Sequence, residues 1–339
     1  MKFVLSAAAL LVPFALAATG QWQQQTIKTD ADFRGLSVVS PKVAWVSGTK
    51  GTFGRTTDAG VTWTAGNVAG AEKLDFRDVE AFNDSTAYLM SAGPGEASRI
   101  YKTTDGGKSW AEQFKNPEPK GFLDAIAFWD EKNGIAMGDP VNGRFQLVAT
   151  SDGGANWIPL AEKSRPEALA NEGAFAASGT CLITRGEKDV WFCSGGAKAV
   201  RVFHSNDRGQ TWTVAEVPLA AGVESAGAFA LAFRDRNHGV IVGGDYRKPD
   251  AAIATIATTT DGGKTWTAVE KPPAFRSAIG WAKDRWIAVG TSGSNSSPDG
   301  VTWKTLDRKN YNSVAFTATG EGWAVGPKGR IARFMKDDK

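Results

Sequence analysis

The sequence predicts an all-β protein: a seven-bladed β-propeller of four-stranded blades, closed by the N-terminal strand. Three observations predict it. A turn motif recurs six times at intervals of 38 to 55 residues, short strands fill each interval, and the last unit is one strand short. Recurrence at such a period indicates an array of supersecondary units that bury their hydrophobic faces against one another.

The recurring turn has the form Asp-x-Gly-x-x-Trp, as from Asp105 to Trp110, with a shorter sixth copy. The carboxylate can accept hydrogen bonds from nearby backbone N–H groups, and glycine adopts the positive φ that a tight turn needs. The tryptophan begins the next strand and can be buried between units. The pattern resembles the Asp-box, or bacterial neuraminidase repeat, and we expect its aspartates to be structural. They are Asp58, Asp105, Asp152, Asp207, Asp261 and Asp299.

Each unit contains four short segments rich in Val, Trp, Phe and Gly, which are typical of strands. Those of the first unit are expected at residues 36–39, 43–48, 52–56 and 61–65. A seventh unit ends the chain without a fourth strand. Residues 21–27 match the missing strand, with Trp22 in the place that Trp63 occupies in the first unit. Closing a ring in this way removes exposed strand edges. Six or eight blades are the alternatives, because the fourth unit is long and the sixth is short.

Residues 1–17 have the pattern of a secretory signal, with Lys2, an apolar run and cleavage near Ala17. The alternative is a membrane anchor, but the run stops near Ala18 and is short for a span. We therefore expect an exported protein, periplasmic or extracellular, whose residues 18–339 form one propeller. No other segment is apolar enough for a membrane span. Subtracting Lys2 from the formal charge of +3 leaves +2, which argues against a nucleic-acid partner. We expect a monomer.

The two cysteines, Cys181 and Cys193, flank a hairpin centred near Glu187 and should lie opposite each other. A disulfide is plausible in an oxidising compartment, although neighbouring strands often hold their Cβ atoms too far apart. Bridge and free thiols both stay open. No metal-ligand spacing surrounds them, and we expect no metal and no cofactor.

In a propeller the innermost strands begin at the top face, where ligand sites are expected on loops. Aligning these starts places three arginines, Arg34, Arg77 and Arg276, at one repeat position in blades one, two and six. Leu123 and Ala228 fill the position in blades three and five, so the fold itself does not require a charge there. Arginines converging on a channel mouth focus an electrostatic field. The alternative is solvated charges in local ion pairs, which contribute little.

Acidic residues fall mainly on the other side of the same face. They are Asp124, Asp139, Glu172 and Asp245. Together with the arginine arc, they are the candidate binding residues.

The stretches Phe33-Arg34-Gly35-Leu36 and 44–48, with Gly322-Trp323-Ala324-Val325-Gly326, resemble the photosystem II stability and assembly factor family. The resemblance implies a non-catalytic propeller that binds protein through an arginine patch, with Arg34, Arg77 and Arg276 at the matching positions. The expected partner is thus a protein or another acidic ligand at the top face. The cysteine-containing fourth blade and long loops at 138–145 and 243–250 depart from the family pattern.

The competing function is a glycoside hydrolase on the same scaffold, with a glycan as ligand. A sialidase is disfavoured because the Arg-Ile-Pro segment that should precede the first turn is absent. A glycosidase with two carboxylates flanking the bond stays open, since Asp124, Asp139, Glu172 and Asp245 could meet across the channel. No sequence motif supports a redox enzyme. The expectation leans toward a binding protein without catalysis.

Overall fold

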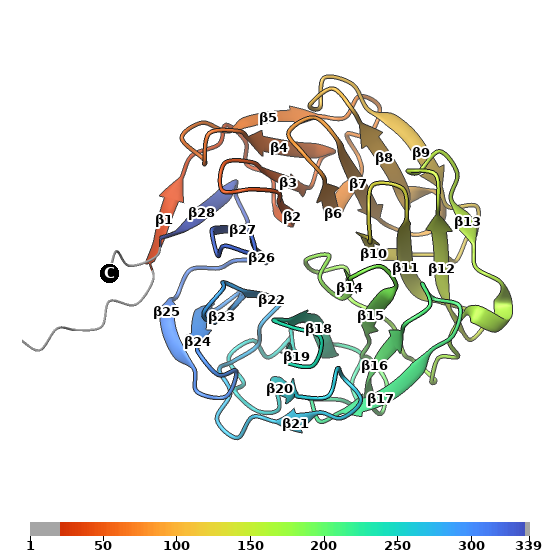
Figure 1. The fold of residues 1–339 in the computed structure, drawn as a ribbon, viewed down its shortest axis with the longest axis vertical. Coiled ribbons are helices and arrows are strands. Elements are labelled where there is room, and N and C mark those ends of the chain that lie inside the picture. The colour runs from red at the N-terminus through yellow and green to blue at the C-terminus, as the bar shows by residue number, and fades with distance from the viewer. Residues whose placement is uncertain (1–20, 336–339) are drawn as a thin grey trace, which may run out of the picture.

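Seven four-stranded antiparallel sheets surround a central axis in the computed structural model, which describes residues 21–335 (Figure 1). The predicted all-β, seven-bladed propeller is confirmed, and six or eight blades are excluded. The expected signal segment at 1–17 and its cleavage near Ala17 lie outside the described residues. Within residues 21–335, no helix has the length and apolar character needed to cross a bilayer.

The strands of the first four blades follow one another in chain order, and each blade runs from its innermost to its outermost strand. Blade one contains β2 (Phe33–Val38), β3 (Ala44–Gly48), β4 (Thr52–Thr56) and β5 (Thr64–Asn67). Blade two contains β6 (Asp75–Ala81), β7 (Ala87–Ala92), β8 (Arg99–Thr103) and β9 (Ala111–Lys115). Blade three contains β10 (Leu123–Phe128), β11 (Gly134–Val141), β12 (Arg144–Thr150) and β13 (Ile158–Pro159). Blade four contains β14 (Leu182–Arg185), β15 (Asp189–Cys193), β16 (Val200–Ser205) and β17 (Thr213–Val217).

The remaining blades follow the same order, except that the seventh takes its outermost strand from the other end of the chain. Blade five contains β18 (Ala226–Phe233), β19 (Gly239–Asp245), β20 (Ile256–Thr259) and β21 (Thr267–Ala268). Blade six contains β22 (Ala278–Trp281), β23 (Trp286–Gly290), β24 (Gly293–Ser297) and β25 (Lys304–Asp307). Blade seven contains β26 (Ser313–Phe316), β27 (Gly322–Gly326), β28 (Arg330–Met335) and β1 (Gln21–Gln25).

The N-terminal strand closes the ring as predicted. β1 pairs antiparallel with β28 from Gln21 opposite Met335 to Gln25 opposite Ile331. The Trp22 indole N–H donates to Ser294 Oγ at 2.9 Å, which ties this strand to blade six. The Trp22 ring also packs against Phe334, with centroids 5.2 Å apart. Hydrogen bonds and aromatic packing therefore join the two ends of the chain.

The six aspartate turns lie between the third and fourth strands, at the end of the molecule opposite the starts of the innermost strands. In the second turn, Asp105 Oδ1 accepts from the Ser109 backbone N–H at 3.0 Å and from Thr103 Oγ1 at 2.8 Å. Thr103 Oγ1 in turn accepts from the Gly107 N–H at 3.0 Å, and Gly107 has a φ of +86°. The fourth strand of blade one begins at Thr64, later than expected, because residues 61–63 still belong to its turn.

Tryptophans fill the space between blades. Trp45, in the second strand of blade one, is fully buried, and Trp110 of blade two meets it edge-on with ring centroids 6.2 Å apart. Trp63 meets Trp323 of blade seven in the same way at 6.4 Å. The tryptophans that end the first two turns thus pack against a neighbouring blade.

The segment between blades three and four crosses the central channel, where Figure 1 shows it reaching inward before β14. Ser178 Oγ donates to the Ser277 carbonyl of blade six at 3.0 Å, and the Ser178 carbonyl accepts from Ser313 Oγ of blade seven. Gly179 has a φ of +78°, and a Cβ there would lie 2.1 Å from Asp78 Oδ1. We call residues 173–181 the plug segment, since they bond to blades on the far side of the channel.

Cys181 and Cys193 lie opposite each other in blade four, next to the pair Leu182–Phe192, and the Cys193 N–H donates to the Cys181 carbonyl at 3.0 Å. Both are buried free thiols in the structure. Burial raises the pKa of both thiols above the usual range.

Candidate functional site

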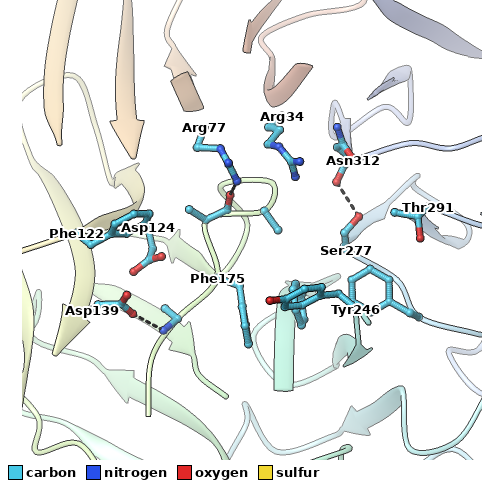
Figure 2. Close-up of a pocket in the computed structure, with 15 residues that line it drawn as sticks. Arg34, Arg77, Phe122, Asp124, Asp139, Phe175, Tyr246, Ser277, Thr291 and Asn312 are labelled. Atoms are coloured by element: carbon cyan, nitrogen blue, oxygen red, sulfur yellow. Dashed lines mark hydrogen bonds between the residues drawn. The ribbon is translucent and has the colours of Figure 1, made fainter. Parts of the chain in front are cut away.

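A cavity of about 450 Å³ opens on the top face, between the starts of the innermost strands and the plug segment (Figure 2). Two arginines form one wall, Arg34 and Arg77, and two aspartates form the opposite side, Asp124 and Asp139. Aromatic rings line the same cavity, with Phe175 and Tyr246 on the side away from the arginines. The cavity thus contains both signs of charge together with apolar surface.

The residues aimed into this cavity sit at β-bulges. The pairing of β2 with β3 skips Arg34, and that of β6 with β7 skips Arg77. The same shift skips Asp124 in β10 and Phe229 in β18. A bulge adds one unpaired residue to a strand and re-aims its side chain. Four blades therefore present their extra residue to one cavity.

These bulges correct the alignment made from sequence. Leu123 and Ala228 were expected in the arginine position, but each is paired in its ladder and fully buried. Asp124 and Phe229, one residue later, take that position instead. The expectation that the fold does not require an arginine there still holds, because an acid and an aromatic ring occupy the same structural place.

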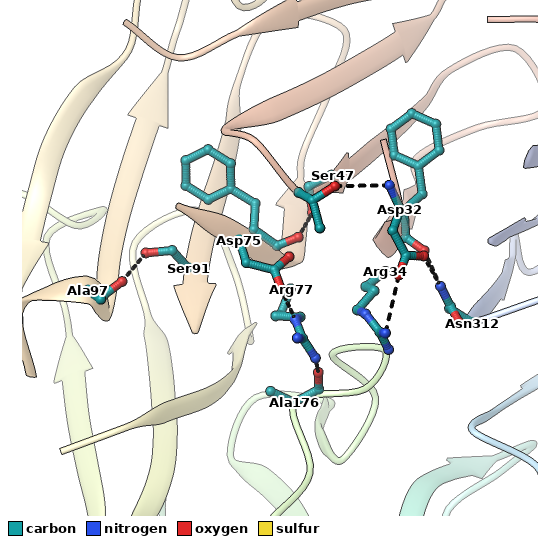
Figure 3. Close-up of polar contacts among 12 residues, drawn as sticks. Asp32, Arg34, Ser47, Asp75, Arg77, Ser91, Ala97, Ala176 and Asn312 are labelled. Carbon is teal, nitrogen blue, oxygen red and sulfur yellow. Dashed lines mark hydrogen bonds and ion pairs between the residues drawn. The ribbon is translucent and has the colours of Figure 1, made fainter. Parts of the chain in front are cut away.

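A carboxylate two residues earlier orients each cavity arginine (Figure 3). Arg34 Nη2 donates to Asp32 Oδ2 at 3.3 Å, and Arg77 Nε donates to Asp75 Oδ2. Arg77 Nη1 also donates to the Ala176 carbonyl of the plug segment at 2.9 Å. Blades one and two thus share the local sequence Asp-Phe-Arg, in which the aspartate fixes its own arginine.

Electrostatics at this wall favour an anion. Burial, followed by the nearby Arg77, lowers the pKa of the Arg34 guanidinium. Arg34 Nε is buried and has no hydrogen-bond partner within residues 21–335. An anion between the two guanidinium groups would reduce their repulsion and accept from donors that already point toward it.

Arg276 does not join this wall. Its Nε donates to Asn295 Oδ1 at 2.9 Å, and its Nη1 donates to the Phe275 carbonyl at 2.6 Å and to Ser292 Oγ at 3.1 Å. The side chain is buried inside blade six, and burial lowers its pKa to about 10. The residue two positions earlier is Ala274, so no aspartate turns this arginine toward the cavity. The predicted arc of three arginines is a pair in the structure.

The four candidate acids divide into two pairs. Asp124 and Asp139 line the cavity, whereas Glu172 and Asp245 do not. Glu172 has a fully buried side chain that accepts from Arg201 Nε at 2.8 Å, Ser194 Oγ at 2.6 Å and the Leu169 N–H at 2.7 Å. Asp245 accepts from the Arg247 N–H within its own loop at 3.0 Å. Glu172 is thus paired internally, and Asp245 bonds to its own turn.

Asp124 and Asp139 are held in an unfavourable environment for charge. Asp124 is 1% exposed, and burial together with the nearby Asp139 carboxyl raises its pKa well above the usual range. Burial also raises the pKa of Asp139, whose Oδ1 accepts from the Ala174 N–H at 2.9 Å.

Aromatic side chains that the sequence analysis did not single out also line the cavity. Phe175 of the plug segment stacks on Phe229, with centroids 3.9 Å apart and planes 9° from parallel. Phe275 meets Phe229 edge-on, and Tyr246 lies nearby with 44% of its surface exposed. The signal in the sequence that could have indicated these rings was Phe175, a single aromatic residue within a run of Gly, Ala and Ser.

A second cavity of about 770 Å³ continues from the first toward blades four and five. Both are lined by Asp139, Ala174, Phe175 and Tyr246. Gly195, Gly196 and Gly222 contribute to the wall of the second cavity. Because glycine has no side chain to fill the space, a ligand can extend along this path.

Comparisons with known proteins agree with the fold. A family model described as "Photosynthesis system II assembly factor YCF48" matches residues 14–118. The structure of YCF48 from Cyanidioschyzon merolae has a TM-score of 0.67 at 16% identity and covers 93% of this chain and 99% of that chain. No curated protein sequence matches.

Two further solved structures are also similar to this chain. Streptogramin B lyase has a TM-score of 0.63 at 13% identity, covering 93% of this chain and 97% of that one. A structure described as "YCF48 bound to D1 peptide" has a TM-score of 0.48 at 18% identity, covering 95% and 99%. At such identities a structural likeness shows the fold alone.

The family match covers the described strands β1 to β9, and so both Asp-Phe-Arg segments. The chain is a seven-bladed propeller that resembles the photosystem II assembly factor YCF48.

Proposed function

We propose that this chain is an exported protein-binding module, an assembly or stability factor, that holds an acidic group of its partner between Arg34 and Arg77. The observation that carries the proposal is the pair of guanidinium groups on one wall of the top-face cavity. Each is fixed by its own aspartate, and Arg34 Nε is a buried donor without a partner in residues 21–335. A carboxylate would complete these bonds.

Two further facts support this role. Phe229 occupies the bulge position that Arg34 and Arg77 occupy in their blades, so stability alone does not demand arginine there. The family model described as an assembly factor matches the segment that contains both arginines. Export enters the proposal through the signal-like residues 1–17.

The test measures binding of N-acetylated peptides of random sequence that end in either a free carboxylate or an amide, with and without an internal Glu. We expect the native protein to select carboxylate-bearing peptides and to bind them less tightly as salt rises, since exposed charge pairs are screened. Replacing Arg34 and Arg77 by Ala should abolish that selection. Arg276→Ala is the matched control, because it removes an arginine of the same column that does not line the cavity. Unchanged selection in the Arg34→Ala/Arg77→Ala variant would refute the proposal.

A glycoside hydrolase is the second candidate, and one observation favours it. Asp124 and Asp139 share the cavity, and the raised pKa of Asp124 is what a general acid requires. A screen of chromogenic glycosides decides between the two functions. Turnover that Asp139→Asn abolishes would establish the hydrolase, whereas absence of turnover on every substrate would leave the binding module.

A further inference from the structure

We propose that Asp124 and Asp139 form a cation subsite that binds the ammonium or guanidinium group of a Lys or Arg side chain on the partner. This inference rests on the proposed function and sharpens it. The partner segment would place an acidic group at Arg34 and Arg77 and a basic group at the opposite side of the same cavity. The site would then recognise a pair of opposite charges rather than negative charge alone.

The two acids come from adjacent strands of blade three, and both occupy irregular positions in the sheet. Asp124 is the residue skipped where β10 pairs with β11. Asp139 is the residue skipped where β11 pairs with β12. Both line the cavity, and Figure 2 shows their carboxyl groups close to each other on the side away from the arginines. Two bulges on neighbouring strands thus bring two carboxyl groups together.

The protein leaves this pair incompletely satisfied. Asp124 Oδ2 is buried and has no hydrogen-bond partner within the described part of the chain. A buried polar atom without a partner costs free energy, and a buried carboxylate costs more. Glu172 is also buried, but it accepts hydrogen bonds from Arg201 and Ser194. Within residues 21–335, Glu172 is therefore paired with a cation, whereas no cation is in hydrogen-bond contact with Asp124 Oδ2.

Arg77 is near enough to act on Asp124 electrostatically, but its guanidinium bonds to other groups. It donates to Asp75 and to the Ala176 carbonyl. Within the described residues no hydrogen bond or ion pair joins Arg77 to Asp124, which leaves Asp124 Oδ2 available to an external cation.

Aromatic rings beside the acids indicate an organic cation. Phe122, Phe175 and Tyr246 line the cavity with Asp124 and Asp139. Ammonium and guanidinium groups bind to aromatic faces as well as to carboxylates. A calcium or magnesium ion instead takes six or more oxygen ligands. Two carboxylates among rings suit a side chain of Lys or Arg.

The second cavity supports a peptide as the ligand. It continues from the first at Asp139 and Tyr246 and has a volume of about 770 Å³. A segment whose basic side chain reaches Asp139 can therefore extend outward along the glycine-lined wall. A free metabolite would not need this path.

The experiment uses fluorescent, N-acetylated and C-amidated heptapeptides that carry one Glu, one Phe and one Lys in a glycine background. The Glu–Lys separation runs from one to five residues. Each peptide is paired with a Lys→Gln version and a Glu→Gln version, and binding is followed by anisotropy. At the preferred separation, native protein should bind the Lys peptide about tenfold or more tightly than its Gln version, as charge-assisted hydrogen bonds imply.

The variants assign each preference to its wall. Asp124→Asn with Asp139→Asn should remove the preference for Lys and keep that for Glu, whereas Arg34→Ala with Arg77→Ala should do the reverse. Glu187→Gln is the matched control, since this exposed acid lies in the turn between β14 and β15 and lines neither cavity, and it should keep both preferences. If the double aspartate variant does not fold, Asp139→Asn alone replaces it, because the new amide oxygen can still accept from Ala174.

The outcomes separate the two proposals. A preference for Glu with none for Lys at any separation overturns the cation subsite and leaves the proposed function standing. A Lys preference that survives the aspartate variants also overturns the subsite. If no peptide binds with a Kd below about 1 mM, both proposals fail.

Discussion

Aspartates on the two faces of this propeller are in opposite states. In the bottom-face turns, the side chain and backbone of Ser109 donate to Asp105 and lower its pKa. Asn156 does the same for Asp152 and lowers its pKa to about 2. On the top face, burial raises the pKa of Asp124 and Asp139. The same residue type is thus saturated with donors at one end of the molecule and short of them at the other.

This difference separates aspartates that hold the fold from the two aspartates of the proposed binding site. A turn aspartate finds its donors within four residues of itself, so the motif carries everything it needs. In the cavity, by contrast, Asp124 Oδ2 has no hydrogen-bond partner among residues 21–335, whereas the buried Glu172 carboxylate is bonded to Arg201. Polar groups left unpaired in a buried site point to function, because folding alone would favour pairing them.

The largest effect should come from a change that affects both faces together. Deleting residues 21–25 removes a five-residue strand ladder and the Trp22 packing, of which the aromatic ring alone contributes about 3 kcal/mol. Urea unfolding of the truncated chain should show a loss of several kcal/mol, and peptide binding should weaken as well. An unchanged midpoint would mean that ring closure does not support the top face.

Next in size is the loss of binding without loss of stability. Arg34→Ala with Arg77→Ala should weaken binding of a carboxylate-bearing peptide by about 2 to 3 kcal/mol, the range for hydrogen bonds to charged groups. Arg276→Ala should do the opposite, lowering stability and leaving affinity intact, because among residues 21–335 that guanidinium bonds to Phe275, Ser292 and Asn295 of its own blade. Calorimetric melting and anisotropy on the same samples check both. Equal effects from the two variants would show that Arg34 and Arg77 do not differ from Arg276 in their role.

Substitution of single aspartates should lower stability on the bottom face and should not lower it in the top-face cavity. Asp105→Ala leaves the Ser109 donors of its turn unpaired and should destabilise by about 1 to 3 kcal/mol. Asp124→Asn removes a buried, underbonded acid and should leave stability equal or higher at neutral pH. Thermal melting of the two variants provides the measurement. A large loss from Asp124→Asn would show that this acid supports the fold.

The smallest expected effect is a pH dependence with two signs. The folded-state pKa of Asp152, about 2, lies below its unfolded value, so its contribution is present above about pH 4 and lost as pH falls toward 2. Burial raises the pKa of Asp78 to about 7, so its contribution is present below about pH 4 and lost as pH rises to 7. Unfolding free energies of Asp152→Asn and Asp78→Asn, measured between pH 2 and 8, should each show one of these slopes reduced, because other aspartates contribute to the remainder. A slope that is unchanged in its variant belongs entirely to other groups.

Sequence reasoning could predict the fold because the signals are local. Six turns, their tryptophans and the placement of Trp22 specify seven blades and their closure. The site depends on features without a local signal. A bulge shifts the alignment by one residue. Leu123 and Ala228 were therefore aligned with the arginines in place of Asp124 and Phe229.

The orientation of Arg276 differs from that of Arg34 and Arg77 because of one residue near it in the sequence. Ala274 stands where Asp32 and Asp75 stand in blades one and two, and this difference was visible in the sequence once the role of the aspartate was known. The plug segment was not foreseeable, because its bonds join residues from blades far apart along the chain.

The pairing of β1 with β28 also sets the order of events in folding. Its strands are separated by more than three hundred residues, so this is among the least local contacts in the molecule. Loop-closure entropy must be overcome before such a contact can stabilise the chain, which makes folding of this topology slow. Strand β1 is synthesised before β28 and can pair only after β28 has been made. Until then, the unpaired edges of both strands can associate with other chains.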